Sequence, residues 1–75
     1  MMSPKLQPCV IRTRLIEELT SAHRNVAALG DQEVGAVVRG DMEAVRQLQG
    51  SLRQARAIRD EAMRAFRDHL GEHGC

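Results

Sequence analysis

The sequence predicts an all-α protein, an antiparallel helical hairpin that dimerises into a four-helix bundle. In the second half of the 75-residue chain, apolar residues recur at alternating spacings of three and four, as in a long helix packed along another helix. The chain has one aromatic residue, and a core of small aliphatic side chains suits helix-on-helix packing. The one run rich in β-branched residues, 34–38, is interrupted by Gly35, so we expect no strand.

The chain is short enough to form a single domain. Residues 1–8 are expected to form a flexible tail, because Pro4 and Pro8 interrupt any helix there. Residues 9–75 are expected to form the helical-hairpin domain. Its first helix is predicted over about residues 9–38, where apolar side chains fall on one stripe.

Two similar segments of the sequence could form the turn that reverses the chain. In both Gly30-Asp31 and Gly40-Asp41, the glycine can end a helix in the left-handed conformation and the aspartate can cap the next helix. A turn at residues 39–41 gives two helices of similar length, whereas a turn at Gly30 leaves half of the second helix without a mate. We therefore expect the turn at 39–41, a second helix over about residues 42–70, and a break or kink at residues 30–31.

The predicted contact line of the second helix contains one charged residue, Arg59. This side chain either pairs with Glu18 of the first helix or lies at the edge with its head in water. Leu19, Leu52 and Phe66 are expected to be fully buried. The residues of the line are Val45, Leu48, Leu52, Ala55, Arg59, Ala62, Phe66, His69 and His73.

The apolar arc of each helix is wider than a two-helix contact can cover. Ile16 and Val34 flank the stripe of the first helix, and Ile58, Met63 and Leu70 flank that of the second. A chain this short gains little stability from one core. Pairing two hairpins would cover these side chains, so we expect a homodimer, and the alternative is a monomeric hairpin with scattered exposed apolar residues.

The charge balance argues against a general attraction to nucleic acid or membranes. Eleven basic residues nearly offset ten acidic ones, for a net charge of +1. No secretory signal and no apolar stretch of transmembrane length is present in the sequence, so we expect a cytoplasmic protein. Its two cysteines lie near opposite ends of the sequence and do not form a secreted disulfide framework.

Five arginines fall on one outer face of the second helix. Such a stripe could contact the phosphates of a nucleic acid. The sequence shows no stacking aromatic residues and no recognised binding motif, so we favour a solvated face on which Asp60 pairs with the arginines four residues before and after it. The five are Arg46, Arg53, Arg56, Arg64 and Arg67.

The candidate site lies where the two arms end. His69 and His73 are four residues apart and share a helix face, and equal arms about Gly40 bring Cys9 beside them and beside Cys75. Two thiolates and two imidazoles could hold zinc, and the two thiols could instead form a disulfide. Histidines near a helix C-terminus also interact favourably with the helix dipole when no ligand is present.

The sequence contains no nucleophile–base set and no glycine-rich phosphate loop, so we expect no enzymatic activity. We expect a small helical protein–protein interaction or regulatory module with an unidentified protein partner. The alternatives are a metal-binding or thiol-redox module and, less favoured, a nucleic-acid-binding protein.

The end of the chain resembles the endings of a group of small proteins. The segment Arg67-Asp68-His69-Leu70-Gly71-Glu72-His73-Gly74-Cys75, preceded by Ala55-Arg56 and Asp60-Glu61-Ala62, is similar to the endings of small uncharacterised bacterial proteins that finish in His-x-x-x-His-Gly-Cys. The resemblance implies a helical hairpin and draws attention to the terminal histidines and cysteine. It implies no activity.

Overall fold

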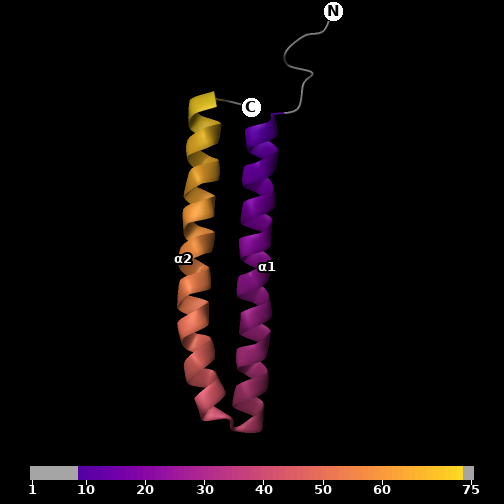
Figure 1. Ribbon diagram of the computed structural model, residues 1–75, viewed down its shortest axis with the longest axis vertical. Coiled ribbons are helices and arrows are strands. Elements are labelled where there is room, and N and C mark those ends of the chain that lie inside the picture. The colour runs from indigo at the N-terminus through magenta and orange to yellow at the C-terminus, as the bar shows by residue number, and fades with distance from the viewer. Residues whose placement is uncertain (1–8, 74–75) are drawn as a thin grey trace, which may run out of the picture.

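The protein folds as two long helices packed side by side in opposite directions (Figure 1). The computed structural model describes residues 9–73, apart from the side chain of His73. Helix α1 spans Val10–Arg39 and helix α2 spans Met42–His73, and the described residues contain no strand. The predicted all-α helical hairpin is therefore confirmed. Neither of the two helices is long and apolar enough to cross a membrane.

The chain reverses at Gly40, which adopts the left-handed conformation with φ 73° and ψ 20°. The N–H of Gly40 donates to the carbonyl oxygen of Val37 at 3.0 Å, and the N–H of Asp41 donates to that of Ala36 at 2.9 Å. This pair of bonds is the Schellman motif, which satisfies carbonyl groups left open at the end of a helix. The glycine is required because L-residues with a side chain adopt this conformation only at a cost.

Asp41 starts the second helix directly after the turn. Its Oδ1 accepts the backbone N–H of Ala44 at 3.1 Å, and its carbonyl oxygen accepts that of Val45 at 3.1 Å. Glu43 places a negative charge in the first turn of α2, where the helix dipole favours it. The three residues of the predicted turn thus contain both the end of one helix and the cap of the next.

The structure corrects the predicted helix boundaries at three places. Helix α1 runs without interruption through Gly30 and Asp31, so the break, one of the two predicted alternatives, does not form. A glycine inside a helix costs only about 1 kcal/mol, and α1 offsets this cost by packing along α2. Cys9 caps α1 instead of opening it, and α2 continues past residue 70 to His73.

The core is a thin line of small side chains between the two helices. Full burial of Leu52, which is 2% exposed, is confirmed, whereas Leu19 and Phe66 are only half-buried. A pair of helices covers each helix from one side, so a side chain at the edge of the contact line keeps an open flank. The buried apolar residues of the described chain are Ala36, Val45, Leu52 and Ala55.

Candidate functional site

The open end of the hairpin brings together two chemically active side chains. Cys9 lies at the start of α1 and His69 lies in the last part of α2, and 60 positions separate them in sequence. Because both arms are of nearly equal length about Gly40, these residues meet, and Cys9 Sγ lies 3.4 Å from His69 Nε2. The structure thus places side by side two of the four residues that the sequence grouped as a site.

Cys9 also caps α1. Its backbone is extended, with φ −79° and ψ 104°, and its Sγ accepts the backbone N–H of Arg12 at 3.4 Å. The hydroxyl group of Thr13 donates to the Cys9 carbonyl oxygen at 3.2 Å, which holds the residue against the first turn. The sulfur therefore lies at the positive end of a 30-residue helix dipole.

His69 is the buried polar side chain of the described chain, at 7% exposure. A buried imidazole needs hydrogen-bond partners, and the Cys9 sulfur lies within reach of one ring nitrogen. No buried side-chain nitrogen or oxygen atom between residues 9 and 73 lacks a partner. The contact between Cys9 and His69 therefore links the start of α1 to the end of α2 through side chains alone.

Cys9 is disulfide-bonded, and the described residues contain no free cysteine. Of the other predicted site residues, Cys75 and the side chain of His73 lie outside the part of the chain that the structure describes. Within that part, no three histidine, cysteine or acidic side chains gather as a metal site would need. Zinc binding by Cys9, His69, His73 and Cys75 stays a prediction for the reduced chain, because zinc binds thiolates.

The five arginines predicted to form an outer face are all exposed on α2. Arg46 pairs with Glu43 at 3.2 Å, but the predicted pairs of Asp60 with Arg56 and Arg64 do not form. Asp60 instead contacts its neighbour Arg59 at 3.1 Å. Exposed ion pairs of this kind contribute little free energy, so Asp60 can exchange one nearby arginine partner for another at little cost. Nucleic-acid binding by this face stays a prediction.

Arg59 does not form the buried pair with Glu18 that the sequence allowed. Its guanidinium group binds Asp60 through Nε and Nη2, and its side chain is 27% exposed. Arg59 thus adopts the alternative position, at the edge of the contact line with its guanidinium group toward water.

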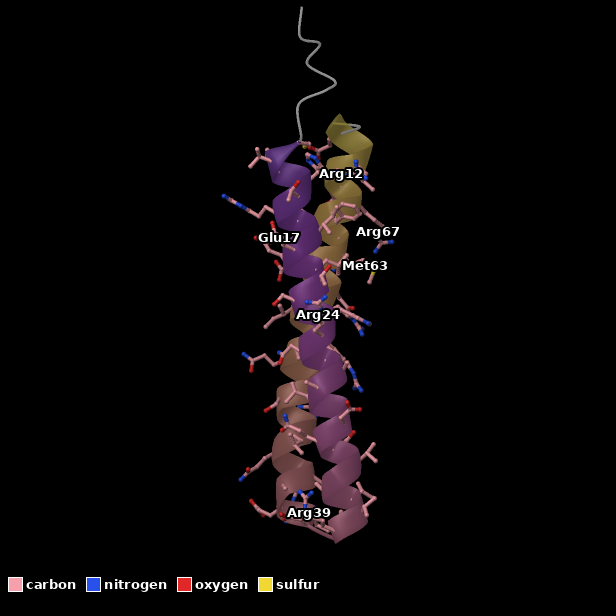
Figure 2. All side chains as sticks on the ribbon, turned by 90° about the vertical axis from the view of Figure 1, so that its right-hand side faces the viewer. Arg12, Glu17, Arg24, Arg39, Met63 and Arg67 are labelled. Carbon is pink, nitrogen blue, oxygen red and sulfur yellow. The ribbon has the colours of Figure 1, made fainter. Side chains whose placement is uncertain are left out.

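Sequence reasoning missed an acidic groove on the opposite side of the hairpin. Glu17 and Glu18 of α1 and Glu61 of α2 line this open groove together with Ser21 and Ile58. Figure 2 shows Glu17 on one side of the hairpin and Met63 and Arg67 on the other. The sequence did contain a signal for this groove, because the three glutamates lie at similar numbers of residues from Gly40 along the two helices.

Comparison with known proteins adds no relative. No protein-family model, no curated protein and no solved structure matches the chain. The functional argument therefore depends on the geometry of the chain itself.

Proposed function

We propose that this chain is a small helical protein–protein interaction module that self-associates, two hairpins forming a four-helix bundle. The observation that carries the proposal is the imbalance between buried and exposed apolar side chains. Four apolar residues are buried in the described chain, whereas ten large apolar side chains are more than a third exposed. We place the module in the cytoplasm, and its role is binding rather than catalysis.

A single hairpin forms only one layer of secondary structure. The shortest dimension of the chain, measured between Cα atoms, is 11 Å, whereas two layers of helices with axes about 8–10 Å apart would measure about 13–15 Å. Stable domains bury their apolar surfaces between at least two packed layers. A second hairpin supplies the missing layer.

The exposed apolar residues are unequally distributed between the two sides of the hairpin. We define the apolar flank as Ile16 and Val37 of α1 with Met63 and Leu70 of α2. Their exposed fractions are 41%, 56%, 38% and 40%. Each of the four directly follows a residue that packs between the helices. One residue along a helix corresponds to a rotation of about 100° about the helix axis, so each flank side chain points about 100° away from the contact line, in the same direction of rotation. In antiparallel helices, the same sense of rotation leads to the same side.

The opposite side of the hairpin is more polar at the matching positions, although Ile58 is exposed there. The residues that directly precede those four inward-facing positions are Arg14, Gly35, Glu61 and Asp68. No large apolar side chain occurs among them. The apolar flank is therefore the side that a second layer would cover, and the acidic groove would remain in water.

The side of the hairpin that carries the apolar flank is large enough for a stable dimer interface. Two helices of about 30 residues present a side of about 900 Å², and a stable protein–protein interface buries about 800 Å² on each partner. Covering the exposed parts of the four flank side chains contributes roughly 1 kcal/mol each, since full burial is worth about 1.5–3 kcal/mol. A second copy of the chain is the occupant that presents an equal apolar flank.

Size-exclusion chromatography with light scattering tests the proposal. We expect twice the 8.4 kDa mass of one chain, and a melting temperature that rises with protein concentration. A single-chain mass together with a concentration-independent melting temperature would show that self-association is wrong.

Two charge insertions test which side docks. Met63→Glu places a carboxylate on the apolar flank, between Arg59 and Arg67 on the same helix face, so the hairpin itself should tolerate it. Ile58→Lys is the matched control, because its ammonium group would lie in the acidic groove near Glu61. We expect Met63→Glu to produce monomers and Ile58→Lys to remain dimeric. The reverse result would move the interface to the groove side.

A second candidate function is favoured by the contact between Cys9 and His69. Cytoplasmic disulfides are most often transient, catalytic or redox-sensing. A disulfide-bonded cysteine beside a buried histidine, at the open end of a small hairpin, suits a thiol-redox module. Reversible oxidation by a glutathione buffer, followed by mass spectrometry under non-reducing conditions, tests this candidate.

A further inference from the structure

We propose that the two hairpins of the dimer pack with their open ends at the same end of the bundle, so that α1 of each copy lies along α2 of the other. The proposal rests on the self-association proposed above, and it adds the orientation of the second copy and the residues that select it. In the alternative, reversed arrangement, α1 lies on α1, α2 lies on α2, and each open end lies over a turn.

Residues at equal numbers of positions from Gly40 lie at nearly equal heights along the hairpin. The contact of Cys9 with His69 demonstrates this at the open end, because these residues lie 31 positions before and 29 positions after Gly40. The two helices run side by side over the whole length between that contact and the turn (Figure 1). The number of positions from Gly40 therefore gives the height of each flank side chain.

At one height, both helices present a large side chain of the apolar flank. Ile16 lies 24 positions before Gly40, and Met63 lies 23 positions after it. When the open ends lie together, Ile16 packs on the partner's Met63, and Met63 packs on the partner's Ile16, because a two-fold contact is reciprocal. The four side chains then form one apolar layer of the bundle.

The reversed arrangement separates these side chains. The middle of the hairpin lies near Arg56, which is 16 positions after Gly40. A second hairpin turned end over end about this height would bring Met63 opposite the partner's Gln49 and Ile16 near the partner's Asp31. Each apolar side chain would then cover a polar group, which loses its water without gaining a hydrogen bond.

Two exposed arginines near the middle of α2 also oppose the reversed arrangement. Arg53 and Arg56 directly follow the buried residues Leu52 and Ala55, so both lie on the side of the apolar flank. In the reversed arrangement α2 packs on α2, and the symmetry places these arginines opposite the same arginines of the partner subunit. Like charges that face each other across an interface weaken association.

With the open ends together, the two arginines face α1 of the partner subunit instead. Arg53 lies 13 positions after Gly40, level with Ala27, and Arg56 is nearly level with His23, 17 positions before Gly40. Neither position carries a second arginine. The small side chain of Ala27 leaves space for an arginine stem, whose guanidinium group can extend into water.

The first experiment mixes two charged variants that should each fail to self-associate. Ile16→Lys and Met63→Glu both place a charge in the apolar layer, and both positions are exposed in the single hairpin, so each variant should fold as a helical monomer. With the open ends together, an equimolar mixture pairs the new ammonium group with the new carboxylate in one contact and keeps Ile16 on Met63 in the other. By analytical ultracentrifugation, we expect the mixture to associate at least about tenfold more tightly than either variant alone.

A matched mixture tests the reversed arrangement. Met63→Glu is combined with Gln49→Lys, whose ammonium group meets the new carboxylate only if the hairpins are turned end over end. By native mass spectrometry, we expect Met63→Glu to form heterodimers with Ile16→Lys at least about tenfold more tightly than with Gln49→Lys. The reciprocal pair, Ile16→Glu with Met63→Lys, decides if circular dichroism shows that one of the first variants has lost its helices.

The unsubstituted chain separates the two proposals. If it has the mass of one chain in solution, self-association itself is wrong. If it forms dimers but Met63→Glu pairs with Gln49→Lys as tightly as with Ile16→Lys, or pairs with neither, the proposed orientation is wrong and the four-helix bundle stands.

Discussion

Leu52 offers the sharpest test of the packing, because it is the largest of the four buried apolar side chains. At 2% exposure, Leu52→Ala removes nearly all of its apolar contact and leaves a cavity between helices that can relax only in part. Buried leucine-to-alanine changes lower the free energy of unfolding by about 2–5 kcal/mol. We expect about 3 kcal/mol here because the contact between the two helices is narrow and open at its sides. A 75-residue chain has a total stability of about 4–11 kcal/mol, so the change removes a large part of it.

Thermal unfolding followed by circular dichroism at fixed protein concentration measures the effect. For a domain of this size, 1 kcal/mol shifts the melting temperature by about 4–8 °C, so we expect Leu52→Ala to melt about 12–24 °C below the parent. Gln49→Ala, three residues earlier on the exposed surface of α2, is the control and should change stability by less than about 0.5 kcal/mol. Equal melting temperatures for both variants would show that Leu52 does not lie in a packed core.

Three further substitutions test the helix ends and the interior of α1, each by the same thermal assay. Gly40→Ala should destabilise the hairpin by about 1–2 kcal/mol, because alanine at φ 73° is strained although nothing lies within 4 Å of its Cβ; an unchanged melting temperature would contradict the Schellman turn. Asp41→Ala should cost about 1 kcal/mol by removing the acceptor of the Ala44 N–H, and Asp41→Asn should restore it. Gly30→Ala should stabilise the protein by about 0.5–1 kcal/mol, since the site is helical and open; destabilisation would contradict an uninterrupted α1.

The sequence was sufficient to predict the turn at Gly40 because two independent signals agree there. A glycine followed by an aspartate supplies local turn chemistry, and the equal length of the two arms supplies a reason for the chain to reverse at that point. At Gly30 and Asp31 the same local signal occurs without the second one, and the helix continues. Local preferences of about 1 kcal/mol yield to the packing of a long helix along its neighbour.

The extent of burial could not be predicted from periodicity alone. The spacing places Phe66 on the contact line, and the structure agrees, but it leaves the ring half-buried. A helical repeat specifies the direction of a side chain, whereas burial depends on how many neighbouring helices surround it. The half-buried Phe66 and the exposed Met63 are therefore what a single hairpin predicts, and a second layer would change both.

At the candidate site, too, the sequence predicts which residues face each other but not how buried they are. Equal arms predict that Cys9 and His69 meet, and they lie 3.4 Å apart. The spacing gave no indication that the cysteine would also cap α1 or that His69 would be the buried polar residue of the described chain. Those two properties depend on the backbone conformation before the first turn and on the crossing of the helices, which no spacing in the sequence encodes.

The two ends of the hairpin face different physical problems, which accounts for the chemistry at the open end. At Gly40 the backbone itself joins the helices, and the Schellman bonds and the Asp41 cap satisfy both helix ends locally. At the other end nothing in the backbone holds α1 to α2, and helix ends fray when few tertiary contacts hold them. The contact of Cys9 with His69 joins the helices there through side chains. The open end therefore depends on contacts between side chains, whereas the turn end is held by the backbone and its caps.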